Sequence, residues 1–291
     1  MNSIDYVFPN ILRSHNRGGL AERWDLAKEH DCRYIEVPAS FVRNPFEANL
    51  TGQSYGELFT SETIPLLYNK GANLPNDLTY ILHTEPGFGP GGIYTPKYLK
   101  WHDRKWVESY ANMIADLADH LGKVPHTIEI HAGSPKTTPV DYALAMIILQ
   151  TVFENRTGKK PDIVLENLMR SHVYSGVQLA EIWTQLELTD PDLKASCGFV
   201  VDASGIWTAN RTNKEEYQIS FDAIPTDAVK GLRIHHKHLP INEAEDPAYW
   251  AYFREWVSTI DHSIFINPEI HTMAAFLELY PYCQGLEVKQ G

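Results

Sequence analysis

Eight short apolar segments of the chain each carry, at or near their end, a side chain that can bind a metal ion or move a proton. They are Asp5–Asn10, Tyr34–Val37, Tyr80–His83, Ile128–His131, Ile163–Glu166, Phe199–Asp202, Leu232–His235 and Ile264–Glu269. Apolar strands buried on both faces are expected in an α/β protein, but strand after strand ending in His, Asp or Glu is not. In a barrel of eight parallel strands, the carboxyl ends of the strands form the rim of the active site. The pattern therefore predicts a metal enzyme built on such a barrel.

Four of these side chains recur at regular intervals along the second half of the chain. Asp202 follows Glu166 by 36 residues, His235 follows Asp202 by 33, and Glu269 follows His235 by 34. Each interval is about the ~30 residues of one strand-plus-helix unit. Because side chains alternate along a strand, the larger apolar residues should face the surrounding helices and these four the barrel axis. Three carboxylates and one imidazole at similar height suit Zn²⁺, Mn²⁺ or Fe²⁺.

A single acidic residue after a strand is more often a helix N-cap or part of a surface ion pair than a metal ligand. Carboxylates that face one another inside a barrel are costly, however, unless they are paired or bound to a metal. The shared strand phase of the four side chains therefore favours one metal site over four unrelated roles.

Other polar side chains on the strands are candidates for contacts to a substrate or to the metal ligands. Asn10, Glu36 and Glu129 belong to this group. Arg233 and Lys237 suit an anionic group such as a phosphate or a carboxylate. Their alternative role is to neutralise the acidic ligands.

Three histidines follow one another closely in the stretch His235-His-Lys-His238. Because side chains alternate along a strand, His235 is favoured as the ligand, and His236 is expected to face the helices. His238 lies past the end of the strand, where we expect it to be able to contact a substrate.

Helical patterns alternate with the strands. The clearest spans residues 101–121, where apolar residues recur at three- and four-residue steps before a C-capping Gly122. Further helices are predicted over residues 19–31, 140–155, 177–186, 248–260 and 273–279, with Pro247 opening the fifth of these six helices. Alternation of strand and helix implies a parallel sheet. A (β/α)8 TIM barrel takes ~250 residues, so we expect an α/β protein with a single barrel domain over residues 1–291.

Two stretches interrupt this alternation. Residues 42–76 are rich in Asn, Gly and Pro, and residues 84–100 form a long Gly/Pro loop directly after His83. A long loop at the carboxyl end of a barrel strand usually carries substrate contacts, so we expect residues 84–100 to do so.

Composition narrows the function classes. The formal net charge of −12 argues against a strongly basic nucleic-acid surface, although bound cations would reverse the local charge at a site. No run approaches the ~20 apolar residues of a membrane helix, and the N-terminus lacks the features of a signal peptide. The three cysteines form no CxxC motif and are typical of reduced thiols in a cytoplasmic protein. We expect no membrane partner and leave the oligomeric state open.

The motifs resemble the xylose-isomerase-like superfamily of TIM barrels, and within it the endonuclease IV branch (AP endonuclease family 2). The superfamily likeness is the tetrad Glu166, Asp202, His235 and Glu269. The likeness to the branch comes from His15-Asn-Arg-Gly-Gly-Leu20, from His83, from His131-Ala-Gly-Ser134 and from Val164-Leu-Glu-Asn167.

The resemblance implies a ligand set for two adjacent ions. His83, His131 and Glu166 would hold one ion, and Glu166 would bridge to a second ion held by Asp202, His235 and Glu269. The third ion of the endonuclease IV branch needs further histidines, but this chain has Gly205 and the triplet Asp246-Pro-Ala248 at those places. We therefore expect one or two divalent ions, and not three.

Two enzyme functions fit these residues. The first is endonuclease IV-like hydrolysis of a phosphoester by two adjacent metals, favoured by His83 and His131 and with DNA as a weakly bound substrate at most. The alternative is isomerisation or epimerisation of a sugar or sugar phosphate, with Glu166 or Glu269 moving the proton, favoured by the missing third-ion ligands and the acidic charge. A barrel that only binds a ligand is disfavoured by the intact tetrad. From sequence the hydrolase is slightly ahead, because two additional histidines are positive evidence.

Overall fold

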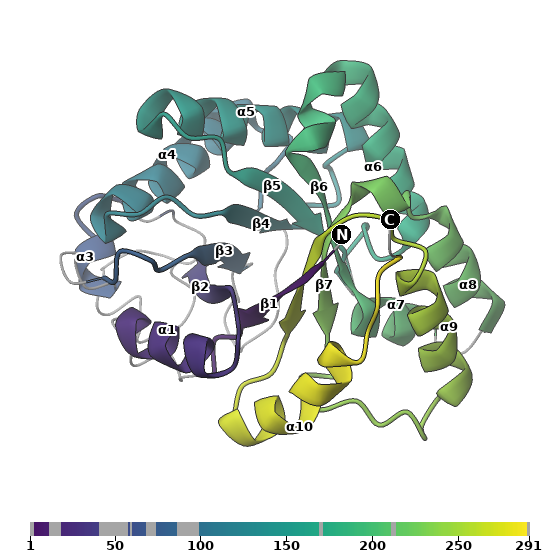
Figure 1. The fold of residues 1–291 in the computed structure, drawn as a ribbon. Coiled ribbons are helices and arrows are strands. Elements are labelled where there is room, and N and C mark those ends of the chain that lie inside the picture. The colour runs from purple at the N-terminus through teal and green to yellow at the C-terminus, as the bar shows by residue number, and fades with distance from the viewer. Residues whose placement is uncertain are drawn as a thin grey trace, which may run out of the picture.

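The computed structural model describes residues 3–11, 19–40, 58, 60–67, 74–85, 99–168, 171–210 and 214–289. Eight parallel strands close into a barrel in chain order, with the helices outside it (Figure 1). The strands are β1 Ile4–Phe8, β2 Tyr34–Ser40, β3 Tyr80–Glu85, β4 Thr127–His131, β5 Asp162–Glu166, β6 Cys197–Asp202, β7 Val229–Ile234 and β8 Ile264–Pro268. The predicted TIM-barrel fold is confirmed.

The outer layer contains the six predicted helices and others that the sequence pattern did not reveal. The predicted ones are α1 Leu20–Glu29, α4 Arg104–Leu121, α5 Pro139–Thr157, α6 Gly176–Thr189, α9 Pro247–Val257 and α10 Met273–Gln284. The additional ones are α3 Ile64–Leu67, α7 Ala203–Asn210, α8 Lys214–Ala223 and the short 3-10 helices η5 Pro191–Ala195 and η6 Thr226–Ala228.

Local sequence signals explain where the helices begin and end. Helix α4 begins at Arg104 because the Asp103 side chain accepts hydrogen bonds from the amides of the first turn. It ends at Gly122, whose φ of 71° lies in the left-handed region that glycine adopts without strain. Pro247 opens α9 directly after the N-cap Asp246, as predicted.

The interior of the barrel is layered, and the layers bring the polar residues to one level. Val7, Tyr34, Ile81, Val164, Val200 and Phe265 form an apolar cluster separate from the main core between strands and helices. Two positions further along four of these strands come Glu36, His83, Glu166 and Asp202. Because side chains two apart share a face, the apolar cluster forms a floor beneath a polar layer at the carboxyl ends.

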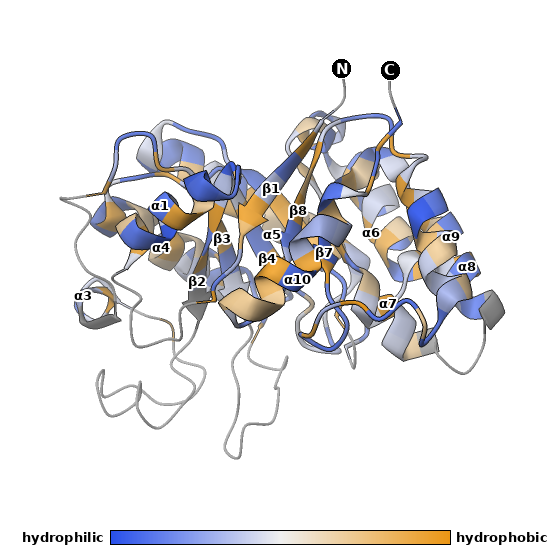
Figure 2. Ribbon diagram, turned by 60° about the horizontal axis from the view of Figure 1, so that its bottom comes forward, coloured by the Kyte–Doolittle hydropathy of each residue, from blue (hydrophilic) through white to orange (hydrophobic). Residues whose placement is uncertain are grey.

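The remaining apolar strand residues point outward, as strand phase predicts. Ile128, Ile130, Ile163 and Leu165 belong to the main core, which packs the strands against the helices. Apolar residues, orange in Figure 2, lie along the strands and on parts of the surrounding helices. No helix in the described ranges combines the length and apolarity needed to cross a bilayer. The three cysteines are buried and free.

Candidate metal centre

The six candidate ligands lie at the carboxyl ends of six consecutive strands. His83 is in β3, while His131, Glu166 and Asp202 are the last residues of β4, β5 and β6. His235 and Glu269 directly follow β7 and β8. All are buried except Glu269, which is half-buried. The register places His131 beside Glu166 and Asp202 beside Arg233, so neighbouring strands present their functional groups at matching heights.

Hydrogen bonds fix which nitrogen of His83 and His131 carries the proton. His83 Nδ1 donates to Glu36 Oε1 at 2.5 Å, and His131 Nδ1 donates to the carbonyl oxygen of Thr84 at 2.9 Å. In a neutral imidazole the other nitrogen then carries a lone pair. Burial lowers the pKa of His131 below its ordinary value, although Glu129 opposes the shift, so this ring is neutral at pH 7.

The Nε2 atoms of both histidines converge on Glu166. The Nε2 atoms of His83 and His131 are 3.2 Å apart, and Glu166 Oε2 lies 3.0 Å from His131 Nε2 and 3.9 Å from His83 Nε2. Glu166 Oε2 is buried and has no hydrogen-bond partner among the described residues. Two imidazole lone pairs and a carboxylate oxygen facing one another repel unless a cation lies between them. These three side chains therefore fit a divalent ion, with each histidine held from behind as metal-ligating histidines usually are.

A second group of short contacts surrounds His235. Its Nε2 lies 3.2 Å from Asp202 Oδ1 and 3.0 Å from Glu269 Oε2. Neither contact has hydrogen-bond geometry, and both Nε2 and Asp202 Oδ1 are buried without a hydrogen-bond partner among the described residues. Two carboxylate oxygens and an imidazole nitrogen that converge without bonding to one another also fit a divalent ion.

His235 holds a proton that such an ion would have to displace. Burial favours the neutral ring, but Asp202 and Glu269 outweigh burial and raise the pKa of His235 to about 10. The amide of His238 donates to His235 Nδ1 at 2.9 Å, so the retained proton is the one on Nε2. An ion at Nε2 requires this proton to leave, because Nδ1 already accepts from the amide. The proton on His235 Nε2 thus lies where an ion would bind.

Arg233 lies in the middle of the acidic side chains. Its guanidinium pairs with both oxygens of Glu129, at 2.6 and 2.9 Å, and reaches Glu166 at 3.2 Å, Glu269 at 3.4 Å and Glu36 at 3.5 Å. The side chain is fully buried. Among the described residues its charged contacts are all carboxylates, which favours the neutralising role over the anion-binding role that the sequence also left open.

The glutamates of this network differ in acidity. Burial raises the pKa of Glu166 well above its ordinary value; Arg233 opposes this shift, and Glu129 and Glu269 add to it. Burial also acts on Glu269, but Arg233 and His235 outweigh it and hold the pKa of Glu269 well below its ordinary value. In the same way, Arg233 and His83 lower the pKa values of Glu36 and Glu129 against the effect of burial.

Charge balance favours two divalent ions. Glu36, Glu129, Glu166 and Glu269 contact the guanidinium of Arg233, and Asp202 contacts His235, which leaves an excess of four negative charges if all five carboxylates are ionised and His235 is neutral. Two divalent cations would cancel this excess. The raised pKa values of Glu166 and His235 mean that protons take the place of cations in their absence. Metal affinity should therefore rise with pH as these protons are released.

The other predicted site residues divide into supporting and peripheral ones. The Asn10 amide donates to Glu36 Oε2, and Asn10 Oδ1 accepts from Arg23, so Asn10 helps to fix Glu36. His236 packs against Trp207 and lies 3.0 Å from Glu245, away from the acidic network, as strand phase predicts.

Lys237 departs from the prediction that it shares the inward face with Arg233 and His235. Strand β7 ends at Ile234, and the chain then turns sharply, so strand alternation no longer applies. The exposed Lys237 side chain places its ammonium group 5.0 Å from the centre of the Trp207 ring. That prediction about the direction of Lys237 is wrong.

Sequence reasoning missed His271. His238 Nδ1 lies 3.7 Å from Glu269 Oε1, and the His238 ring stacks between those of His235 and His271, at centroid distances of 4.7 and 4.9 Å. His271 is exposed in the segment after β8, outside any strand. No periodic pattern in the sequence predicts that His271 lies at the site. Only its position two residues after Glu269 could have suggested it.

Gly205 has a packing role beside Asp202. Helix α7 begins directly after Asp202, and a Cβ at Gly205 would lie 2.6 Å from Asp202 Oδ2. A side chain here would displace the Asp202 carboxylate. Asp246, the other counterpart of a third-ion ligand, caps α9 and accepts a hydrogen bond from Trp207. Both oxygens of Asp246 thus have hydrogen-bond partners.

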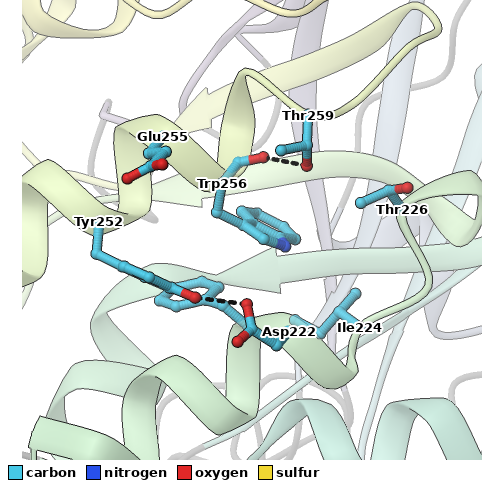
Figure 3. A pocket seen from close by; sticks show the side chains of 8 residues that line it. Asp222, Ile224, Thr226, Tyr252, Glu255, Trp256 and Thr259 are labelled. Atoms are coloured by element: carbon cyan, nitrogen blue, oxygen red, sulfur yellow. Dashed lines mark hydrogen bonds between the residues drawn. The ribbon is translucent and has the colours of Figure 1, made fainter.

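Two predicted features lie outside the described residues: most of the His15–Leu20 motif and most of the 84–100 loop. Among the pockets of the described part, one of about 440 Å³ lies between α8 and α9 (Figure 3). It is lined in part by Tyr252, whose hydroxyl donates to Asp222 at 2.5 Å, and by Trp256. None of the predicted site residues lines it.

Comparison with known proteins identifies the fold. No protein-family model and no curated protein matches this sequence. Among solved structures, a D-tagatose 3-epimerase-like protein matches 97% of this chain and 96% of its own at 14% identity and a TM-score of 0.56. D-allulose 3-epimerase from Methylomonas sp., in complex with D-allulose, matches 97% of this chain and 91% of its own at 12% identity and a TM-score of 0.54. AP endonuclease, family 2 from Brucella melitensis matches 97% and 99% at 10% identity and a TM-score of 0.51. What the chain shares with these structures is the fold, a barrel of eight parallel strands with helices outside it.

Proposed function

We propose that this protein is a divalent-metal-dependent isomerase or epimerase of a sugar or sugar phosphate. The observation that carries the proposal is the pairing of Glu166 and Glu269 around Arg233. The two carboxylates come from β5 and β8, which are three strands apart in the barrel, and they approach the guanidinium at 3.2 and 3.4 Å. A substrate above Arg233 would have one carboxylate on each side.

The two carboxylates have acidities suited to opposite roles in proton transfer. The raised pKa of Glu166 favours the protonated acid, and the lowered pKa of Glu269 favours the carboxylate. Paired groups with pKa values pushed in opposite directions are typical of an acid and a base. In our proposal Glu269 takes the proton from the carbon beside the carbonyl, and Glu166 returns a proton to the opposite face.

The tetrad residues would hold the metal. An ion bound there would polarise the carbonyl oxygen and stabilise the negative charge that develops on it. Arg233 keeps both carboxylates in place beneath the substrate, and Glu36 keeps His83 oriented. The positions of the basic side chains favour a substrate that does not need several basic groups to bind it. Arg233 is buried among carboxylates, which makes it a poor partner for a phosphodiester, and the Lys237 ammonium lies over the Trp207 ring.

The second candidate is an endonuclease IV-like hydrolase of phosphoesters. The convergent lone pairs of His83 and His131 beside Glu166 favour it, because a sugar isomerase with one metal does not need them. Gly205 and Ala248 count against it, since neither can hold the third ion that positions the scissile phosphate in the branch that the sequence resembles.

Exchange of a carbon-bound proton separates the two candidates. The protein, loaded with Mn²⁺ or Zn²⁺, should be incubated in heavy water with D-tagatose, D-allulose or fructose 6-phosphate. We expect one deuterium to appear at a carbon next to the carbonyl of at least one of these ketoses, measured by NMR and mass spectrometry. The chelated protein is the control and should exchange nothing.

Parallel reactions should contain abasic-site DNA and bis(p-nitrophenyl) phosphate. Metal-dependent cleavage of either, with no deuterium in any ketose, would reject the isomerase or epimerase and leave the hydrolase.

A further inference from the structure

The chain makes a tight two-residue turn directly beside the candidate metal centre. His236 and Leu239 exchange both backbone hydrogen bonds, at 2.8 and 3.0 Å, so Lys237 and His238 alone form the turn. Their φ angles are 55° and 59°. Positive φ at both central residues is typical of a type I′ turn, in which Asn and Gly are strongly preferred.

This turn is therefore strained by its own residues. Among the described residues, Asp31, Lys237 and His238 are the ones with a side chain and a positive φ. Lysine and histidine in the left-handed region are less stable than glycine would be, because Cβ crowds the backbone. Strained backbone that persists next to a functional site indicates that the side chains are held there for a purpose.

The turn is held in place from two sides. The Lys237 amide donates to Ser204 Oγ at 3.2 Å, at the start of α7. On the other side, the His238 ring stacks against His271, which follows β8. These contacts leave the His238 ring half exposed, with Nδ1 3.7 Å from Glu269 Oε1. The ring thus borders the space immediately above a carboxylate of the proposed proton-transfer pair.

We propose that His238, supported by His271, is a substrate-contacting residue that binds a hydroxyl group of the sugar next to the reacting carbon. The inference rests on the proposed function, since it names a contact within the same site. An imidazole can donate one hydrogen bond and accept another, and a hydroxyl group does the same. The strain of the turn is the energetic cost of presenting this ring beside Glu269.

Two glycine substitutions within the turn distinguish the contribution of the His238 ring from that of the strained backbone. His238→Gly removes the ring and relieves the strain, yet it keeps the amide that donates to His235 Nδ1. Lys237→Gly relieves strain at the neighbouring position and leaves the ring in place. Both variants should raise Tm by about 2–5 °C, because glycine adopts positive φ freely. Metal content should stay at the wild-type value in both; because His235, His238 and Glu269 are close enough to share an ion, loss of metal in His238→Gly alone would make His238 a ligand and overturn the inference.

The kinetic result should differ between the two variants. For D-tagatose, or for whichever ketose the wild type converts, His238→Gly should raise KM about 10-fold, corresponding to the loss of one or two hydrogen bonds. The turnover number should change less than KM, since Glu166 and Glu269 are untouched. Lys237→Gly should keep the wild-type KM. His271→Ala should raise KM by less than His238→Gly does.

Two other results would overturn the inference alone. One is a His238→Gly variant that gains stability and retains the wild-type KM. The other is an equal rise of KM in Lys237→Gly, which would assign the effect to the turn backbone. A wild-type protein that neither exchanges nor converts any ketose would instead overturn the proposed function, and the role of His238 with it.

Discussion

Replacing Glu166 with glutamine should remove at least one equivalent of bound metal per chain and abolish activity, while the barrel stays folded. Glu166 Oε2 lies beside both histidine Nε2 atoms and contacts Arg233, so the substitution removes the charged ligand of the His83 and His131 group. Loss of a group that transfers protons lowers rates by about 10²–10⁴-fold, and loss of the metal adds to this. Metal content by elemental analysis and activity on the accepted substrate would be measured together.

Stability should respond differently from function in this variant. Burial raises the pKa of Glu166, so its ionised form is unfavourable in the metal-free protein, and the neutral amide removes that cost. Metal-free Glu166→Gln should therefore have a Tm equal to or above that of the metal-free wild type. Glu187→Gln is the matched control, because Glu187 lies on the exposed side of α6 and pairs only with Lys194 in the described structure. Wild-type metal content in Glu166→Gln would rule out Glu166 as a ligand.

Replacing Arg233 with methionine should cost about 3–5 kcal/mol of unfolding free energy at pH 7, because buried carboxylates lose their partner. Glu129 is the most affected, since Arg233 holds both of its oxygens. Denaturant unfolding of the metal-free protein would give the difference. Arg156→Met is the matched control: Arg156 also contacts two carboxylates, Asp116 and Asp119, but at the surface. Its loss should cost no more than about 1 kcal/mol.

The pH dependence identifies the cause of the Arg233 effect. In the wild type, the pKa values of Glu36, Glu129 and Glu269 are lowered. These groups stabilise the fold above the unfolded value of about 4.3, and this contribution is lost as pH falls through their folded values. Without Arg233, burial would raise the pKa values instead, so the variant should lose stability as pH rises above about 4.3. A destabilisation that is the same at pH 5 and pH 8 would contradict this explanation.

Strand periodicity was sufficient to predict the barrel and the position of the tetrad. The two-residue alternation correctly placed His235 inward and His236 against the helices, because both precede the sharp turn. It failed for Lys237, which lies within that turn, where alternation has no meaning. Helices α7 and α8 were not predicted, since α7 follows Asp202 without an intervening loop and neither shows a clear apolar stripe.

The chemistry of the site depends on contacts that no local pattern contains. The protonated nitrogen of His83 is set by Glu36, 47 residues away, and that of His131 by the carbonyl of Thr84. The sequence offered Arg233 as either an anion-binding or a neutralising residue. Only the convergence of four strands on its guanidinium decides between these roles.

The most direct test of the account is the number of metal ions bound per chain. Chelated protein would be reconstituted separately with Mn²⁺ and with Zn²⁺, freed of excess metal and analysed for metal and protein, and the sites would be located by anomalous scattering. We predict two ions at saturation. One should lie among His83, His131 and Glu166, and the other among Glu166, Asp202, His235 and Glu269, with occupancy falling as pH is lowered. A chain that binds no divalent ion at these residues would contradict the account, and a third ion at Gly205 or Ala248 would contradict its ligand assignment.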